Sequence, residues 1–349
     1  MTIVYKIIKK DSNINFNSNF WCHIHCFNFN LFDKFFGRYI ETIENNCSVI
    51  VTYNTGDNIP NKNFIYLHFD NRGLDIGGKF VCIHFLKNLK IPYKFILMIH
   101  SKSNESKRNI YIKPLVDNLE NIKKNSKNDD GIFVHNKLIH PSSEKIGGSF
   151  NKGWGRNTYH VRNLIKHYNV TSCYKNFSFP QGNSYIINHK IADILFGDET
   201  MFLKLNTKDT FDYSWFTKYY HNKLSLIPNI SYAKARDIFK KKKLHGNNIS
   251  TKLGHKALAD SMIEHAFERI VFGLCYKYKK KINILDLSNK NKKFLLKTYN
   301  VKKFNCISPF PSNFNWKTYV QNNEDLSYMN ENQAISHYIN YGQFENRIF

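Results

Sequence analysis

The chain has 349 residues, of which 42% are hydrophobic and 15% aromatic, and its formal net charge is +24. This composition excludes a disordered chain, and the length suits one large domain with a small appendage, or two ordinary domains. The charge indicates an anionic partner, and nucleic acid, an acidic membrane surface, an acidic polysaccharide and a nucleotide diphosphate all satisfy it. Part of the excess reflects an abundance of Asn, Lys and Ile that is typical of AT-rich genes.

The cysteine content and the apolar runs bear on the compartment. Seven cysteines without paired spacing argue against a disulfide framework and favour a reducing environment. No N-terminal stretch has the order of a signal peptide, and no apolar run reaches the roughly 20 residues that span a bilayer. The sequence predicts a cytoplasmic protein, and leaves open peripheral membrane contact through lysine-rich stretches or packaging in a virion.

Residues 21–27, WCHIHCF, have the residue types of a zinc site. In an extended strand, however, the two histidines lie on one side and the two cysteines on the other, so the four cannot converge on one ion. We therefore predict a strand with Cys22, Ile24 and Cys26 in the core and with His25 facing a site.

The following elements alternate between helix and strand. Apolar residues at helical spacing predict a helix over 30–43, and β-rich runs predict strands at 47–53 and 64–69. A glycine-rich turn then leads into a helix over 74–89, and an uninterrupted apolar strand lies within 93–100. The order strand, helix, strand, strand, helix, strand predicts an α/β fold with a mostly parallel central sheet.

The second half of the chain has weaker signals. They indicate a strand at 131–135, a helix around 156–168, a turn, strand and helix within 179–196, and a long helix over 259–273.

Polar residues collect at the predicted carboxyl ends of the strands, where sheets of this kind bind ligands. Among them, DNRGLDIGG (70–78) places three glycines around a helix start, where backbone N–H groups can approach a phosphate. Asp75 would repel a phosphate, so we assign it to hydrogen bonds with a ribose, base or sugar hydroxyl. The alternative interpretation is a tight strand-to-helix turn capped by an aspartate.

The stretch ADSMIEHAFERIVFG (259–273) would carry a row of titratable groups if helical. Asp260, Glu264 and Glu268 then lie on one ridge, and His265 lies beside Arg269. Such a row against an apolar face can hold a general base whose pKa is raised by burial. It also fits a solvated face with helix-stabilising ion pairs.

Six stretches carry a resemblance to a known family: HIHCFNFNLFDKFF, IVTYNTGD, DNRGLDIGGKFVCIHFL, FILMIHSKS, FPQGNSYII and DSMIEHAFERIVFG. In this order they resemble successive blocks of the rhamnan synthesis protein F family, over roughly residues 20 to 275. Members are similar to glycosyltransferases with the nucleotide-sugar-binding GT-A fold and help build rhamnose-containing cell-surface polysaccharide. The resemblance implies a GT-A-like, Rossmann-like domain over 1–300 that transfers rhamnose, another deoxysugar or a hexose to a glycan or glycoprotein.

The resemblance also implies three groups of site residues. The donor-binding group comprises His25, Thr52, Asn71, Arg72, Gly73, Asp75, Gly77, His100 and Lys102. The acceptor or pocket group comprises Gln181, Gly182 and Asn183. The catalytic group comprises Asp260, Glu264, His265, Glu268 and Arg269.

The chain departs from common GT-A enzymes after the strand FILMI. It continues into His100-Ser101-Lys102 instead of Asp-x-Asp, the usual clamp for a divalent metal. Because positive charge or hydrogen bonding can neutralise a diphosphate leaving group as a metal does, we predict metal-independent transfer with no cofactor beyond the donor. Asp129-Asp130 is an alternative metal contact, although Asn128 and Gly131 beside it favour a surface turn.

For the chemistry, we predict that Asp260 deprotonates the acceptor hydroxyl and gives inversion, with Glu264 or Glu268 in reserve. The family helix usually carries glycine and threonine after its aspartate, where this chain has Ser261 and Met262. The sequence therefore does not define the local geometry around the predicted base.

Residues 315–349 resemble a short helical module found beside many glycosyltransferases. We predict a separate docking module over 301–349, without a catalytic part, whose core comprises Trp316, Tyr319, Leu326, Ala334, Tyr338 and Tyr341.

Basic stretches at Lys240–Lys243 and Lys277–Lys281 lie beside Tyr276 and Tyr278. A solvated face explains them best, and a membrane surface or single-stranded nucleic acid is an alternative. Two function classes therefore stand beside the glycosyltransferase: a degenerate fold that only binds glycan, as a structural virion protein, and a nucleic-acid-binding protein. The composition and the C-terminal module resemble proteins of large DNA viruses of amoebae.

Overall fold

The computed structural model describes residues 3–10, 14–57, 59, 62–70, 72–102, 104–143, 158–170, 176–205, 263–286, 295–298, 313–338 and 347–348. The chain divides into two compact units, and the larger one ends at Lys302. Within the described ranges, no helix is both long and apolar enough to cross a membrane.

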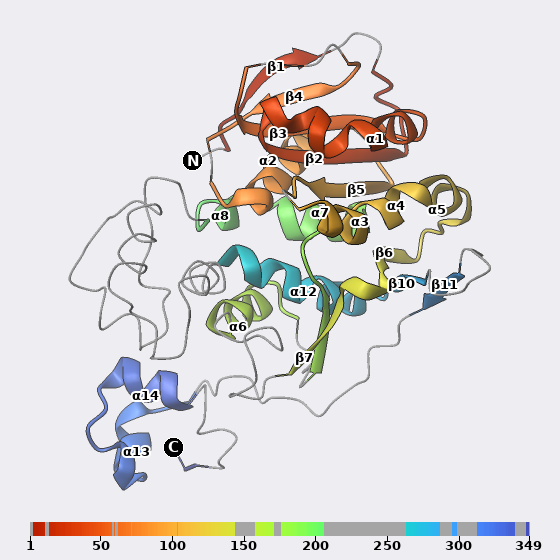
Figure 1. Cartoon of the computed structure of the whole chain (residues 1–349). Coiled ribbons are helices and arrows are strands. Elements are labelled where there is room, and N and C mark those ends of the chain that lie inside the picture. The colour runs from red at the N-terminus through yellow and green to blue at the C-terminus, as the bar shows by residue number, and fades with distance from the viewer. Residues whose placement is uncertain are drawn as a thin grey trace. The chain divides into compact units, whose positions relative to one another are not determined.

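A single sheet organises the larger unit, and its described part has nine strands in the order β1-β4-β3-β2-β5-β9-β6-β10-β11 (Figure 1). Six of them, β2 to β6 and β10, run in one direction, and β1, β9 and β11 run in the other. The predicted α/β class with a mostly parallel sheet is confirmed. The strands are β1 (Lys6–Lys10), β2 (Phe20–Asn28), β3 (Ser48–Thr55), β4 (Ile65–His68), β5 (Phe95–His100), β6 (Asp130–His135), β9 (Tyr185–Asn188), β10 (Lys281–Asp286) and β11 (Leu295–Thr298).

The connections place a switch in strand order between β2 and β5. From β2 the chain runs through α1 (Phe32–Glu44) to β3 and on to β4, always moving toward one edge of the sheet. Helix α2 (Leu74–Asn88) then returns the chain to β5 on the other side of β2. In open α/β sheets, the crevice outside the carboxyl ends of the strands at such a switch is the usual place for a ligand.

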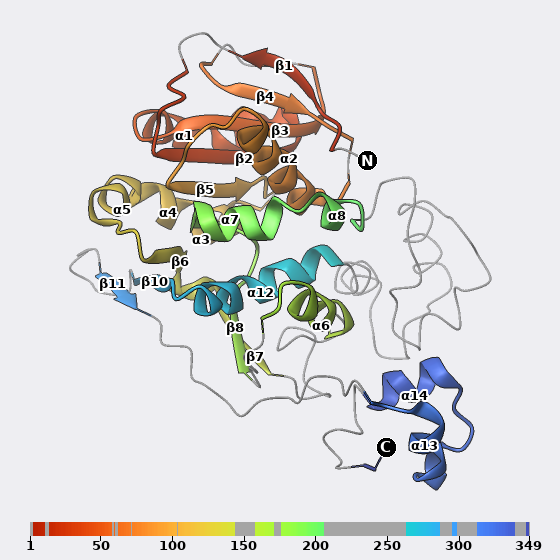
Figure 2. The same ribbon diagram turned by 180° about the vertical axis from the view of Figure 1, so that it is seen from behind.

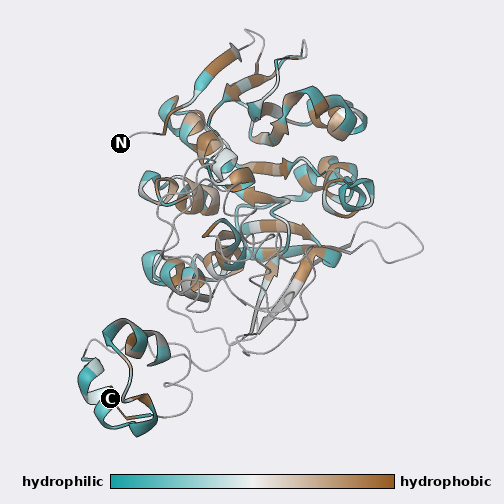
Figure 3. Cartoon of the chain, turned by 60° about the vertical axis from the view of Figure 1, so that its left-hand side comes forward, coloured by the Kyte–Doolittle hydropathy of each residue, from teal (hydrophilic) through white to brown (hydrophobic). Residues whose placement is uncertain are grey.

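Helices cover both faces of the sheet. Helix α1 packs on β2 and β3 together with α4 (Lys113–Asp117), and in this core lie Cys22, Ile24 and Cys26, as predicted (Figure 1). On the opposite face α2 packs with α7 (His189–Phe196), which lies in front in the view from behind (Figure 2). Figure 3 shows the resulting pattern, with apolar strands between helices whose outer faces are hydrophilic.

Three phenylalanines join the helices of the second face. Phe80 of α2 contacts Phe196 of α7 and Phe267 of α12 (Ile263–Lys277), with ring centroids 5.5 Å apart in both pairs. This apolar contact fixes α12 against α2, so polar residues on the two helices can face one site.

The remaining elements of the larger unit are short. They are a two-stranded sheet of β7 (Ile139–Ser143) and β8 (Asn176–Pro180), and the helices η1 (Phe29–Leu31), α3 (Glu105–Tyr111), α5 (Leu119–Asn125), η2 (Asn136–Leu138), α6 (Thr158–His167) and α8 (Glu199–Phe202).

The smaller unit has its own apolar core. Its described part comprises α13 (Trp316–Gln321), η5 (Glu324–Leu326) and α14 (Glu331–His337). The core residues are Tyr319, Leu326, Met329, Ala334 and Tyr338, with Trp316 packed against them. The predicted core is thus confirmed for these residues, whereas Tyr341 lies outside the described ranges.

Candidate functional site

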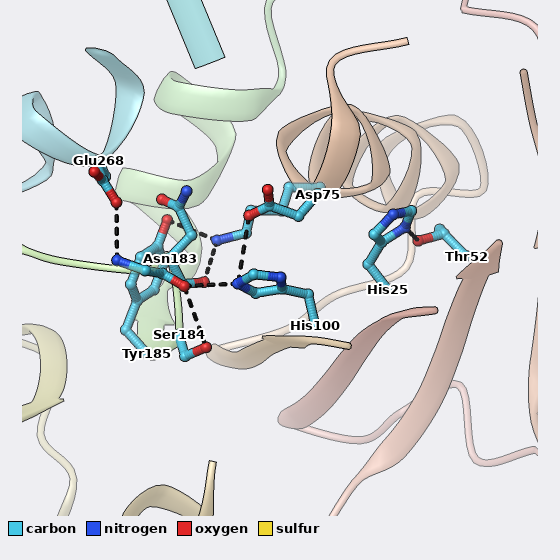
Figure 4. Close-up of polar contacts among 10 residues, drawn as sticks. His25, Thr52, Asp75, His100, Asn183, Ser184, Tyr185 and Glu268 are labelled. Atoms are coloured by element: carbon cyan, nitrogen blue, oxygen red, sulfur yellow. Dashed lines mark hydrogen bonds and ion pairs between the residues drawn. The ribbon is translucent and has the colours of Figure 1, made fainter. Parts of the chain in front are cut away.

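Polar side chains gather where β2 and β5 end, at the switch in strand order (Figure 4). His25 of β2 and His100 of β5 are partners in the parallel register. Both are buried, and Asp75 in the first turn of α2 and Glu268 of α12 face the same region. The polar residues predicted at strand ends therefore meet at one edge of the sheet.

His25 and Thr52 form a buried pair beneath α2. The Nδ1 atom of His25 lies 3.1 Å from the Thr52 hydroxyl, and Nε2 of His23 lies 2.8 Å from the same oxygen. A Cβ atom at Gly78 would stand 2.7 Å from Nδ1 of His25, so only glycine lets the helix come this close. Burial lowers the pKa of His25 to about 4, so the ring is neutral at pH 7.

The glycine-rich turn serves mainly to dock the start of α2. Gly73 has φ 73°, and a Cβ atom there would lie 2.5 Å from Cδ1 of Leu205. At Gly77 a Cβ atom would lie 1.6 Å from the carbonyl oxygen of Arg72. The guanidinium of Arg72 donates to the carbonyls of Leu203 and Leu205, at 3.0 and 3.1 Å. These contacts hold the start of the helix in place.

Asp75, in the first turn of α2, carries an unsatisfied carboxylate oxygen. Its Oδ2 is buried and accepts no hydrogen bond, and Nε2 of His100 lies 3.6 Å from it. Burial raises the pKa of Asp75, but the electrostatic interactions with His100, Lys102 and Lys79 outweigh burial and hold this pKa well below its usual range. Asp75 is therefore ionised. A buried unpaired acceptor costs about 1–3 kcal/mol, which a ligand hydroxyl would recover.

Lys102 supplies a cation whose hydrogen bonds are unused. Its ammonium lies 5.0 Å from the centre of the Tyr111 ring and donates no hydrogen bond to any described residue. Burial lowers the pKa of Lys102, while Asp75 and Glu268 oppose that shift. This ammonium can therefore bind an anionic ligand without giving up a hydrogen bond to a described residue.

Lys79 is a second buried lysine at the site, and sequence reasoning missed it. Its ammonium donates to the carbonyl oxygen of Asn183 at 2.5 Å and to the hydroxyl of Tyr185 at 3.1 Å. Burial lowers the pKa of Lys79 to about 7. The available signal was a single charge in the apolar run IGGKFVCIHF, one helical turn after Asp75.

The turn between β8 and β9 is held by three buried side chains from separate elements. Gly182 and Asn183 both have positive φ, 83° and 56°. The N–H of Gly182 donates to Oε2 of Glu268 at 2.9 Å, and its carbonyl accepts from Nε2 of His100 at 2.7 Å. Lys79 binds the next carbonyl along, that of Asn183. Burial lowers the pKa of His100 to about 3, which keeps this ring a neutral donor.

Helix α12 does not present a solvated face. Glu264, Glu268 and Arg269 are 1%, 6% and 6% exposed, so that alternative interpretation is wrong. Glu268 pairs with Arg269 at 3.0 Å, and Arg269 also lies over the Phe179 ring. Burial raises the pKa of Glu268, although Arg269 opposes this, and burial lowers the pKa of His265 to about 4. Because Glu268 is fully engaged, it suits a positioning role better than that of a base.

Some predicted positions give less information. Asn71, Asp260, Ser261, Met262 and Lys240–Lys243 lie outside the described ranges. Gln181 is partly exposed, and its backbone N–H donates to the carbonyl of Leu138 at 2.8 Å.

The two neighbouring aspartates do not converge. Asp129 is exposed and pairs with Lys281 at 2.6 Å, whereas Asp130 accepts from the Asn283 amide at 2.8 Å. Asp130 is also buried as the first residue of β6, so the predicted surface turn is wrong for this residue. In the parts of the chain that the structure covers, no three His, Cys, Asp or Glu side chains are grouped to hold a metal ion.

The basic stretch after α12 is largely engaged within the protein. Lys277 donates to the carbonyl of Tyr168 at 2.7 Å, Lys280 to the carbonyl of Asn128, and Lys281 pairs with Asp129. These contacts favour the solvated structural face over a surface dedicated to nucleic acid.

Comparisons of the chain with protein-family models, with curated proteins and with solved structures gave no match. Inferences about function therefore rest on the site. It combines an ammonium that donates no hydrogen bond to a described residue, an ionised carboxylate and a rigidly held turn, at the place where α/β sheets bind ligands.

Proposed function

We propose that this chain is a glycosyltransferase that moves a sugar from a nucleoside-diphosphate donor to a hydroxyl group of a glycan or glycoprotein. The observation that carries the proposal is the pairing, at the β2–β5 switch, of a cation that donates no hydrogen bond within the described ranges and an ionised acceptor. Lys102 suits a diphosphate, and Asp75 suits hydroxyl groups. A nucleotide sugar offers both on one molecule.

The strand order supports a nucleotide-binding half within a GT-A-like fold. Counted along the chain from β2, the order β4-β3-β2-β5 reads 3-2-1-4, as in the mononucleotide-binding half of doubly wound sheets. The antiparallel strand β9 then interrupts the parallel order beyond β5. The turn that precedes β9, residues 181–184, therefore lies beside the carboxyl end of β5.

The charges support transfer without a metal ion. Departure of a nucleoside diphosphate requires positive charge at the leaving oxygens. Lys102 is available for this, and the start of the 15-residue helix α2 adds its dipole. His100 is neutral and already donates to Gly182, so its contribution to the diphosphate is smaller than the sequence suggested.

For the acceptor step, we propose Asp260 as the base, with inversion at the anomeric carbon. Glu268 is engaged by Gly182 and Arg269, so it suits the role of base less well than Asp260 does. Deprotonation of the acceptor by a positioned carboxylate contributes about 10²- to 10⁴-fold to the rate.

The proposal is tested with a panel of UDP-, dTDP- and GDP-sugars, by calorimetry and by release of the nucleotide, with EDTA present and with Mg²⁺ or Mn²⁺ added. We expect binding and turnover of at least one donor in EDTA. We also expect Asp260→Asn to keep donor affinity and lose at least about 100-fold in turnover. A chain that neither binds nor hydrolyses any donor contradicts the proposal, and glycan binding without turnover would favour the degenerate alternative.

A further inference from the structure

The side chain of Asn183 is buried, and its amide oxygen accepts no hydrogen bond. The residue is 7% exposed, and Oδ1 has no partner. The amide points away from the backbone carbonyls that Lys79 and His100 bind (Figure 4). A turn residue with φ 56° could be glycine at no steric cost, so a structural role alone does not require an asparagine here.

Hydrogen bonds from three buried side chains hold the backbone of the turn that carries this amide. Glu268 binds the N–H of Gly182, His100 binds its carbonyl, and Lys79 binds the carbonyl of Asn183. These groups come from α12, β5 and α2, and each is 7% exposed or less. Three buried polar side chains thus fix the orientation of one unpaired amide.

The chemistry around the amide identifies the part of the donor that it can bind. Oδ1 of Asn183 and Oδ2 of Asp75 are both buried acceptors that lack a donor. Nε2 of His100 lies 3.6 Å from Oδ2 of Asp75 and donates to the carbonyl of Gly182, the residue before Asn183. Two unpaired acceptors, one of them ionised, repel phosphate oxygens and attract O–H groups. Lys102 provides the complementary place for phosphate.

We infer that Asn183 is a specificity-determining residue that, with Asp75, hydrogen-bonds hydroxyl groups of the donor's sugar. Lys79, His100 and Glu268 are positioning residues that act through the 181–184 turn. This inference rests on the proposed function and deepens it, because it separates recognition of the sugar from recognition of the diphosphate.

The first test compares Asn183→Gly with the wild-type chain. Glycine accepts the positive φ, so the variant removes the amide and spares the turn. Calorimetry is done with UDP and dTDP, and with UDP-glucose and dTDP-rhamnose. We expect affinity for the bare diphosphate to stay within twofold, and affinity for the nucleotide sugar to fall about tenfold, or about 1.4 kcal/mol.

Asn169→Gly is the matched control. Asn169 also has positive φ, 47°, but it is exposed in the turn after α6. We expect it to change neither affinity. The inference is overturned if Asn183→Gly weakens both ligands equally, or neither.

A double-mutant cycle tests the positioning role. Lys79→Met should weaken the nucleotide sugar selectively, and adding Asn183→Gly should bring little further loss, because both changes remove the same contact. Lys102→Met should weaken diphosphate and nucleotide sugar alike, and its effect should add to that of Asn183→Gly. If Lys79→Met does not fold, Glu268→Gln replaces it, since the amide oxygen still accepts from Gly182 and only a mild selective loss is expected.

Additivity of the Lys79→Met or Glu268→Gln change with Asn183→Gly would overturn the positioning role. If the wild-type chain binds neither these four ligands nor any other donor of the UDP-, dTDP- and GDP-sugar panel, the proposed function itself fails, and that result is distinct from equal loss in the variants.

Discussion

Two lysines at the site differ in what their ammonium groups contact. Lys79 donates to the Asn183 carbonyl and the Tyr185 hydroxyl, whereas Lys102 donates to no described residue. A buried cation with satisfied hydrogen bonds stabilises the fold around it, while one without them is available to an anion. The two residues should therefore respond differently to substitution.

Lys102→Met should weaken nucleoside-diphosphate binding by about 10- to 100-fold, because a hydrogen bond to a charged group contributes about 1.5–3 kcal/mol. The melting temperature should change little, since the substitution removes the ammonium contact with the Tyr111 ring but no hydrogen bond to a described residue. Titration calorimetry with UDP and dTDP measures the effect. Lys107→Met, on the exposed side of α3, removes the same charge nearby and should leave the affinity within twofold. Equal losses of diphosphate affinity in the two variants would mean that Lys102 contributes only to the overall positive potential and makes no direct contact with the ligand.

Three buried histidines should make the free energy of unfolding fall as the pH is lowered. Burial lowers the pKa of His25 to about 4, that of His100 to about 3 and that of His265 to about 4. The histidines of an unfolded chain have a pKa of about 6.5. Between about pH 6.5 and about pH 4 the unfolded chain binds protons that the folded chain does not. Stability is thus complete above this window and falls as the pH drops through it.

Urea unfolding at a series of pH values measures this fall. Each histidine adds up to about 1.4 kcal/mol per pH unit to the slope. His25→Gln should make the slope shallower, even if the variant is less stable at neutral pH. The exposed His189 provides the control, and His189→Gln should leave the slope unchanged. An unaltered slope in His25→Gln would contradict the buried, neutral state.

At the scale of elements, the β8–β9 turn depends on a glycine. Gly182 has φ 83°, and a Cβ atom there would lie 1.8 Å from Cε1 of Tyr111. Gly182→Ala should lower the free energy of unfolding by about 2 kcal/mol or more, through backbone strain and displacement of the ring. It should also weaken donor binding, because the turn carries Asn183.

Gly37→Ala is the matched comparison. Gly37 lies in the exposed interior of α1, where the nearest atom to a new Cβ is 4.0 Å away. Alanine should raise the free energy of unfolding by up to about 1 kcal/mol, since glycine is a poor helix former. Thermal unfolding of both variants should therefore give shifts of opposite sign, and shifts of the same sign would refute the difference in packing.

Elements with strong periodicity could be predicted from the sequence, and elements that depend on distant partners could not. The pattern of residues 21–27 correctly placed Cys22, Ile24 and Cys26 in the core. By contrast, β1 pairs at the sheet edge with β4, and β10 pairs with β6, about 150 residues earlier in the chain. The short helices α3 to α5 likewise lack the length that makes a helical repeat visible.

The same limit applies to the site. Polar residues at strand ends were expected to meet, and His100, Lys102 and Asp75 do so. The bonds from Lys79 and Glu268 to the 181–184 turn join residues some 80 to 100 positions apart, so spacing along the chain gives no sign of them. By contrast, the glycine motif was interpreted as an approach to a phosphate, and the groups that lie close to Gly77 and Gly78 in the structure belong to the protein itself.

At the scale of the whole molecule, the two units have separate apolar cores. The core of the larger unit is drawn from β2 to β10 and the helices on them, and that of the smaller unit from Tyr319 to Tyr338. No described residue of the candidate site comes from the part of the chain after Lys302.

We therefore expect a chain of residues 1–302 to unfold cooperatively and to bind the nucleotide sugar within twofold of the full chain. Calorimetry measures the affinity for the nucleotide sugar, and urea unfolding measures the cooperativity. The rate of transfer to a glycan acceptor, compared between the two chains, then tests whether residues 303–349 have a docking role. Loss of cooperative unfolding, or of donor affinity, in the shorter chain would show that the smaller unit is part of the folded site.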